Sequence, residues 1–388
     1  MLLAQLPVRR LSLSRWAEPA ILKSLEPFCE LTELDLGDSS TDVLTITDGS
    51  LASLPPLPEL HTLSLRRCIG ISDAGVQRLC RQRLPSLAVL DLSGTRVTGT
   101  TGFSSLAAAE GDTSSRDSSA SGGSSPSASL RSGAVAVGLR DLTLVGCRAF
   151  SAEGLAAVCE AHSASLRSLR LCGTAVLPYG VNLVRMTAAK GLQKLDLGPS
   201  FEVNSVGLAS LASCPELTDL RIGNFNLRPQ APTSASLSST SASATSAAAP
   251  LASLERLALG GMFASHGLHL LPPLPRLRRL ELTGLDSACD GVLRQLLGRG
   301  CTQLQELRLV SGGPDLTPAG LLALAPLPSL RRLQLVSCPS AKGSAVQALV
   351  EACWQAGRRL RVEVHAKAAS ASGGEDGQAA AAAVVYGS

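Results

Sequence analysis

The six-residue frame Leu-x-x-Leu-x-Leu recurs along nearly the whole chain and constrains its fold more than any other feature. Thirteen copies, the last of them degenerate, begin at Val8, Leu31, Leu60, Leu87, Leu139, Leu166, Leu192, Leu217, Leu254, Leu277, Leu304, Leu330 and Arg359. Most successive copies start 23–29 residues apart. A single core stops growing at about 250–300 residues. A chain of 388 residues with this period is therefore predicted to stack repeats whose neighbours bury each other's leucines.

Each repeat is predicted to contain a short strand, a turn and a helix. The alternation in the Leu-x-Leu part of the frame is typical of a strand with leucines inward and the intervening residue outward. Ser72 and Thr317 are expected to act as helix N-caps, with Pro318 at the first helical position. A glycine precedes the inward apolar residue of these helices, and we expect it to allow close approach to a neighbouring backbone. These glycines are Gly75, Gly154, Gly207, Gly267, Gly291 and Gly320.

The predicted fold class is α/β, a solenoid of about 13 strand–turn–helix repeats curved into a horseshoe, with strands on the concave side and helices on the convex side. It is expected to span residues 1–365. Two Ser/Ala-rich inserts, about 111–136 and 228–250, and an Ala/Ser/Gly-rich tail at 366–388 are expected to be disordered, because they lack the apolar residues a core needs.

The frame followed by Cys68, Cys147 or Cys338, and then by Ile-Ser/Thr-Asp-x-Gly, resembles the cysteine-containing leucine-rich repeat. That subtype is most familiar from the substrate-recognition arms of F-box proteins. The resemblance implies a protein–protein recognition scaffold in an SCF-type ubiquitin ligase, or a relative without an F-box. Because the first frame begins at Val8, we expect any contact with ligase subunits to need a region upstream of Met1.

A second interpretation is a repeat array in signalling, similar to those of NOD-like receptors and ribonuclease inhibitor. Those arrays alternate units of about 28–29 residues and favour Asn where this chain has Cys or Thr.

Composition and motifs exclude several other classes of function. The formal net charge is only +4, which argues against nucleic acid as a partner. The longest apolar runs are far shorter than the roughly 20 residues of a membrane span. The 11 cysteines contain no Cys-x-x-Cys, so we expect reduced thiols and a cytoplasmic or nuclear protein. His266 and His269 lack further ligands nearby. No metal site, no cofactor and no enzymatic activity is expected.

The outward residues of the strands remain as the candidate partner-binding surface. In each frame these are the third and fifth residues, which form what we call the strand face. Its N-terminal part is acidic and its C-terminal part is rich in arginine. The candidate partner-binding residues are Glu33, Asp35, Asp91, Arg256, Arg279, Arg308, Arg332 and Arg361. One interpretation is a polarised docking surface for a protein; the other is a solvated face of Arg–Glu pairs, each worth little energy. Reversal of Arg279 and Arg332 to Glu is expected to leave the fold intact, because both side chains should point to solvent.

Overall fold

The structure is a computed structural model that divides into two compact units, Met1–Val176 and Leu177–Ser388. It describes residues 8–13, 19–37, 46–81, 84–103, 138–174, 189–198, 214–225, 251–261, 273–284, 301–311, 316–338, 343–365 and 383–386, with short pieces in between from 183 to 294. Both predicted inserts lie outside the described residues.

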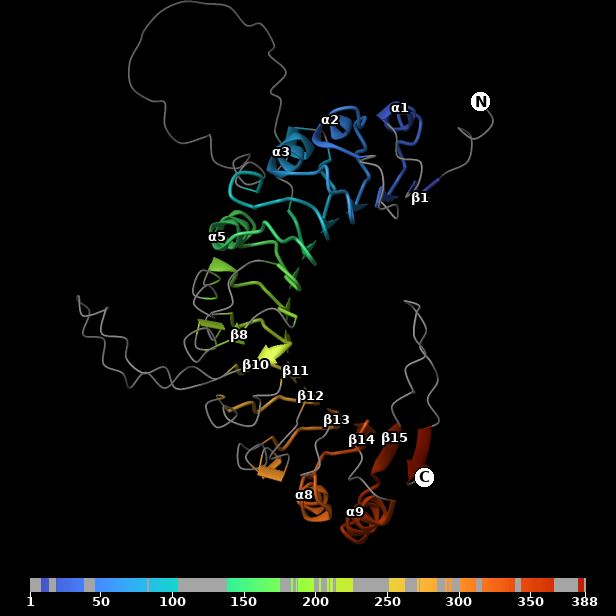
Figure 1. The fold of residues 1–388 in the computed structure, drawn as a ribbon, viewed down its shortest axis with the longest axis vertical. Coiled ribbons are helices and arrows are strands. Elements are labelled where there is room, and N and C mark those ends of the chain that lie inside the picture. Colours follow the sequence, from blue (N-terminus) through green and yellow to red (C-terminus); the bar gives the residue numbers. More distant parts are fainter. Residues whose placement is uncertain are drawn as a thin grey trace, which may run out of the picture. The chain divides into compact units, whose positions relative to one another are not determined.

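Unit 1 is a parallel sheet with helices on one side (Figure 1). Its strands are β1 (Arg10–Ser12), β2 (Glu33–Asp35), β3 (Thr62–Ser64), β4 (Val89–Asp91), β5 (Asp141–Thr143) and β6 (Ser168–Arg170). Its helices are α1 (Pro19–Lys23), α2 (Asp48–Leu51), α3 (Asp73–Arg81) and α5 (Ala152–Ala161). The strand order follows the chain order.

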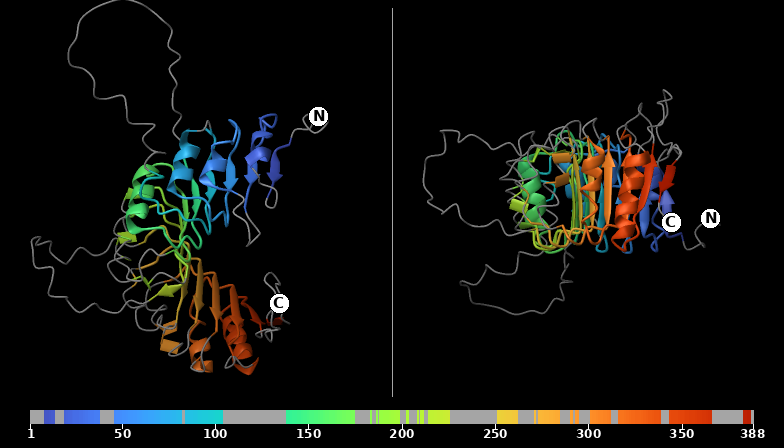
Figure 2. Two further views of the ribbon diagram at one scale, coloured as in Figure 1. Left: turned by 45° about the horizontal axis from the view of Figure 1, so that its top comes forward. Right: turned by 90° about the horizontal axis from the view of Figure 1, so that it is seen from below.

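Unit 2 repeats this arrangement. Its parallel strands are β7 (Lys194–Asp196), β9 (Asp219–Ile222), β11 (Arg256–Gly260), β12 (Arg279–Thr283), β13 (Glu306–Val310), β14 (Arg332–Val336) and β15 (Arg361–His365). A separate parallel pair consists of β8 (Glu202–Val203) and β10 (Asn224–Phe225). The helices are α8 (Pro318–Leu322) and α9 (Gly343–Gln355). In both units the strands lie on one side and the helices on the other (Figure 2).

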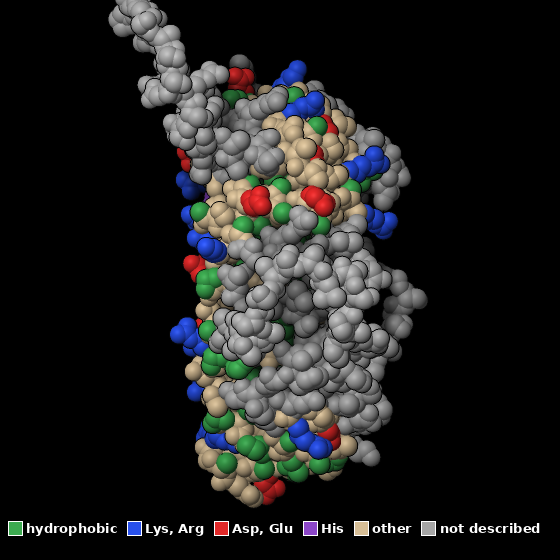
Figure 3. Space-filling view, turned by 90° about the vertical axis from the view of Figure 1, so that its left-hand side faces the viewer, with side chains coloured by type: hydrophobic (Ala, Val, Ile, Leu, Met, Phe, Trp, Pro, Cys, Tyr) green, Lys and Arg blue, Asp and Glu red, His purple; other side chains and the backbone are tan. Residues whose placement is uncertain are grey.

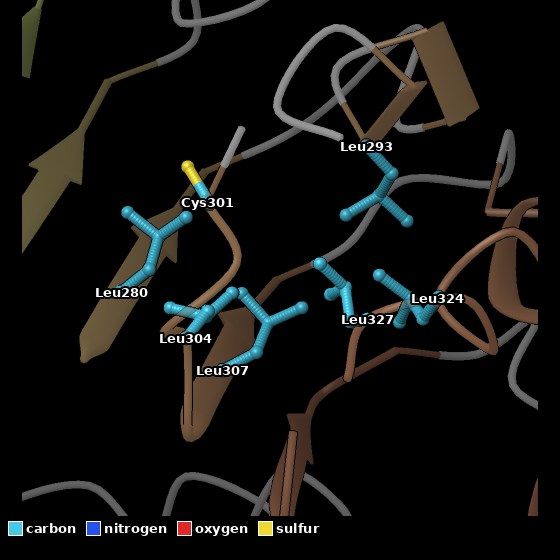
Figure 4. Close-up of a pocket in the computed structure, with 7 residues that line it drawn as sticks. All are labelled: Leu280, Leu293, Cys301, Leu304, Leu307, Leu324 and Leu327. Atoms are coloured by element: carbon cyan, nitrogen blue, oxygen red, sulfur yellow. The ribbon is translucent and has the colours of Figure 1, made fainter. Parts of the chain in front are cut away.

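Each of the thirteen frames contains one of these parallel strands, which confirms the predicted leucine-rich-repeat solenoid. Every strand begins at the third residue of its frame, and equivalent residues pair, as in Leu34 with Leu63 and Leu280 with Leu307. From the second repeat onward the frame leucines are buried between neighbouring repeats, whereas Leu11 and Leu13 of the first are only partly buried. In unit 2, leucines of β12, β13 and the α8 repeat turn toward one another around an apolar cavity of about 10 Å³ (Figure 4). A cavity of that size is at the limit of what one water fills, so the leucines around it are closely packed.

The turn after each strand explains the Cys and Thr positions. The buried thiols of Cys68, Cys147 and Cys338 donate to the carbonyl oxygens of the last frame leucine in the preceding repeat, at sulfur–oxygen distances of 3.4, 3.0 and 3.7 Å. Burial raises the pKa of the Cys147 thiol, which keeps it protonated as a donor. The preceding residue adopts positive φ and is glycine at Gly94 and Gly146. The small thiol side chain at this turn position therefore gives a hydrogen bond to a buried carbonyl oxygen of the preceding repeat.

Helix starts are joined from one repeat to the next by aspartates. Asp48, the first residue of α2, accepts from the N–H and hydroxyl of Ser72 at 2.8 and 2.6 Å. Asp73, the first residue of α3, accepts from the same two groups of Thr98. In unit 2, Asp290 accepts from the N–H and hydroxyl of Thr317. We call these contacts the aspartate ladder.

Both predicted N-caps accept a hydrogen bond in the first turn, Ser72 from the N–H of Ala74 at 3.3 Å and Thr317 from the N–H of Gly320 at 3.2 Å. A Cβ on Gly154 would lie 2.2 Å from the carbonyl oxygen of Thr98, so the expected close approach to backbone is confirmed there. At Gly75 the group approached is instead the Asp48 carboxylate of the aspartate ladder. At Gly291 an added Cβ would meet none of the described residues within 4 Å.

The C-terminal tail differs from the prediction over four residues. Within the segment 366–388, expected to be disordered, Ala383–Tyr386 forms β16, which pairs antiparallel with β15. Val384 and Val385 in this stretch supply the β-branched residues that favour a strand. The rest of the tail lies outside the described residues.

Candidate functional site

The strand face carries the polar side chains that the sequence placed outward. Along a strand, frame leucines such as Leu34 and Leu280 are buried, whereas the residues on either side of them are partly or fully exposed. All eight candidate residues lie on this face: Glu33, Asp35, Asp91, Arg256, Arg279, Arg308, Arg332 and Arg361. The register brings Arg256 opposite Arg279 and Arg332 opposite Arg361.

In unit 1 the strand face carries four acidic and two basic residues. Glu33 forms an ion pair with Arg10 at 3.1 Å. Asp35 accepts from the hydroxyl of Ser12 at 3.3 Å and from the N–H of Gly37 at 3.0 Å. Asp91 accepts from the N–H and the hydroxyl of Ser93. Asp35 and Asp91 therefore also hold the turns that follow their own strands.

In unit 2 every one of the five candidate arginines is ion-paired within the strand face. The pairs are Arg256–Asp219 at 3.1 Å, Arg279–Glu306 at 3.1 Å, Arg308–Glu281 at 3.7 Å, Arg332–Glu363 at 3.0 Å and Arg361–Glu363 at 2.9 Å. Seven basic and five acidic residues share the face in this unit. Its arginines therefore alternate with carboxylates and do not form a patch of a single sign.

Glu363 on β15 is the buried centre of this ion-pair network, with 5% of its surface exposed. It accepts from both Arg332 and the amide of Gln334. The hydrogen bonds from Gln334 and Arg332 lower the pKa of the Glu363 carboxyl, and they outweigh burial, which opposes this shift. Arg332 thus neutralises a buried charge. Arg332 is exposed as predicted, but because of this contact we expect its reversal to lower the stability of the fold.

On the face turned to the viewer in Figure 3, the basic and acidic side chains of the described residues are scattered among apolar and backbone atoms. One exposed aromatic residue escaped the sequence analysis: Trp354 on α9 is 63% exposed. Arg358 and Arg359, which follow Trp354 closely in the sequence, could have indicated that this end of the helix is exposed.

Within the described residues, no group of three or more His, Cys, Asp or Glu side chains could hold a metal ion. Nine cysteines whose side chains the structure describes carry thiols and not disulfides. His266 and His269 lie outside the described residues. None of the described helices is both long and apolar enough to cross a bilayer.

No family model matches the chain, and no curated protein matches it. A chain in the crystal structure of the yeast Rad7 and Elc1 complex has a TM-score of 0.46 and 17% identity, over 85% of this chain and 76% of that one. An internalin from Listeria monocytogenes has a TM-score of 0.40 and 16% identity, over 90% and 71%. The leucine-rich-repeat protein LegL7 from Legionella pneumophila has a TM-score of 0.41 and 14% identity, over 82% and 87%. The fold stated for this chain rests on its own frames and strand register.

Proposed function

We propose that this protein is a non-enzymatic scaffold that recognises another protein through its strand face. The observation that carries the proposal is the register of the strands, which holds third- and fifth-position side chains in rows on one face of each unit. Strands about 4.8 Å apart present such rows as a continuous surface suited to a protein partner. The candidate contacts are Glu33, Asp35, Asp91, Arg256, Arg279, Arg308, Arg332 and Arg361.

The ion pairs give the surface specificity more than affinity. Each exposed pair contributes about 0–1 kcal/mol to stability, so a partner can exchange the carboxylate of Glu306 for one of its own at low cost. A partner with the wrong charge order would instead leave Arg279 or Glu306 without a counter-charge. The surface of the partner that faces the strands is therefore expected to carry alternating positive and negative charges.

We further propose that the bound protein is a substrate for ubiquitination, with this chain as the recognition arm of an SCF-type ligase or of a relative without an F-box. The cysteine-containing repeats, with Cys68, Cys147 and Cys338 at the same turn position, support this proposal. The second candidate is a repeat array in signalling. The turn position counts against it, because such arrays favour Asn where this chain has Cys or Thr; Thr95 and Thr174 stand there and donate to carbonyls of their own turns.

The experiment compares proteins crosslinked in cells to the wild-type chain and to the Arg256→Glu/Arg279→Glu variant. Proteins bound by the strand face should fall by about tenfold in the variant, since charge reversal slows association and opposes docking. Arg278→Glu is the matched control, because Arg278 is exposed beside Arg279 but lies outside the strand. Equal recovery by all three chains would contradict strand-face recognition.

The turnover of the crosslinked proteins separates the two candidates. If the chain is a ligase arm, its depletion should lengthen their half-lives, and a proteasome inhibitor should abolish the difference. Unchanged half-lives would favour the signalling array.

A further inference from the structure

A groove of about 490 Å³ lies at the C-terminal end of unit 2 and shares Arg361 with the strand face. It is lined by side chains of α9 and β16, by Arg358 and Arg359 in the turn that follows α9, and by Arg331 just before β14. In Figure 1, α9, β15 and the last strand lie together at this end. The groove therefore lies where the sheet ends.

Exposed apolar groups converge on this groove. Trp354 is 63% exposed and Val385 is 51% exposed. Among the described residues only five large hydrophobic side chains are exposed, and these two line the same groove. Exposed tryptophan is enriched among the residues that carry most of the binding energy in protein interfaces. Trp354 therefore supplies an anchor that the strand face, with its charged and small polar residues, does not provide.

The charge of the groove is entirely of one sign. Four arginines line it, at 331, 358, 359 and 361, and no carboxylate is among its described lining residues. Arg361 is paired with Glu363 on the strand side. Arg358 donates to the backbone carbonyl oxygens of Ala325 and Leu327, so its charge is held in place but is not neutralised.

Arg331 and Arg359 are exposed, and neither forms an ion pair with a described residue. This distinguishes them from the five arginines of the strand face. A carboxylate that approaches Arg331 or Arg359 has no existing ion pair to displace, and guanidinium groups bind carboxylates with two parallel hydrogen bonds.

We propose that this groove binds a short acidic segment of a partner protein, with an apolar side chain packed on Trp354 and carboxylates at Arg331 and Arg359. Charge complementarity selects this occupant, because the four arginines would repel a basic segment and would have no counter-charge in a neutral one. Arg361 is the one strand-face residue among the described residues that line the groove, so a partner can be held both here and at strands further along the face. Two weak contacts joined in this way bind more tightly than either alone.

The test uses the full chain with Trp16→Phe, which leaves Trp354 as its only tryptophan. The probe is the amidated peptide Glu-Asp-Glu-Leu-Phe-Glu-Asp; in the reference peptide every acidic residue is replaced by lysine. The acidic peptide should shift the Trp354 emission to shorter wavelength and bind with a Kd of about 10–100 µM. The lysine peptide should bind at least tenfold more weakly.

Variants of the two exposed arginines locate the binding site. Arg331→Glu/Arg359→Glu should weaken binding of the labelled acidic peptide at least tenfold by fluorescence anisotropy, and Trp354→Ala at least fivefold. Arg278→Glu should change the Kd by less than twofold; Arg278 holds the same frame position as Arg331, two repeats earlier and outside the groove. If the double reversal lowers the melting temperature, Arg331→Gln/Arg359→Gln provides the same comparison.

Three results would overturn the proposal. The first is no binding of the acidic peptide at about 1 mM. The second is equal loss of binding in the Arg278→Glu control. The third is a wild-type dimer in sedimentation velocity that Trp354→Ala makes monomeric, which would assign the groove to a second copy of the chain. The Arg256→Glu/Arg279→Glu variant should bind the peptide normally, so failure here leaves strand-face recognition untouched.

Discussion

His162 ends α5 with its imidazole buried, and its Nε2 has no hydrogen-bond partner among the described residues. Burial lowers the pKa of His162 to about 4, because the charged imidazolium loses its hydration. In the unfolded chain the same group titrates near 6.5. As the pH falls from 6.5 to 4, the unfolded state therefore takes up a proton that the folded state does not, and stability is lost across that window.

Replacement of His162 by Leu should remove this pH dependence. The wild type should lose about 3 kcal/mol more than the variant between pH 7 and pH 4. Urea denaturation of both chains at the two pH values measures the difference. Identical pH slopes would show that His162 is protonated in the folded protein.

Arg332 and Arg279 are both basic residues at the third frame position, yet they should respond differently to reversal. Arg332→Glu places a second carboxylate beside the buried Glu363 and should cost about 1–3 kcal/mol. Arg279→Glu breaks an exposed pair with Glu306 and should cost less than about 1 kcal/mol. Chemical denaturation of the two variants tests the contrast, and equal losses would contradict a buried charge at Glu363.

At the scale of single elements, α5 depends on a glycine in its first turn. A Cβ at Gly154 would lie 2.2 Å from the carbonyl oxygen of Thr98 and 2.9 Å from Cα of Gly99, and neither backbone atom belongs to a flexible side chain. Gly154→Ala should therefore destabilise unit 1 by about 1–3 kcal/mol. Gly291→Ala is the control; none of the described residues lies within 4 Å of the added Cβ, and the change should be neutral or stabilising by up to about 1 kcal/mol. Thermal denaturation compares them, and a harmless Gly154→Ala would contradict the close approach.

The strands and their register were predictable from the sequence because a frame with alternating leucines allows one inward face. The N-cap at Thr317 was predictable for a similar reason, since capping is local. The ion pairs could not be predicted from the sequence, because they depend on which side chains the register places opposite each other and on the rotamers of those side chains. Glu363 looked like any outward residue, although its neighbours Arg332 and Gln334 bury it. The strand β16 lies outside the Leu-x-x-Leu-x-Leu pattern, so the repeat spacing did not predict it.

At the scale of the whole molecule, the two removable segments should behave differently. Deletion of residues 111–136, which contain no repeat frame, should change the melting temperature by less than about 2 °C. Deletion of 366–388 removes β16, leaves the hydrogen-bonding edge of β15 uncovered, and should lower the melting temperature by several degrees. Differential scanning calorimetry measures both. Equal behaviour of the two deletions would show that β16 contributes nothing to stability.

The aspartate ladder gives the solenoid a direction of growth. Asp48 meets Ser72, and Asp73 meets Thr98, so in each case the earlier repeat supplies the acceptor and the later repeat supplies the donors. A ribosome releases the chain in the same order, N-terminus first. Each new repeat thus emerges beside an acceptor that is already in place, whereas a repeat synthesised without its predecessor would begin its helix with that bond missing. Assembly during translation should consequently advance one repeat at a time behind the ribosome.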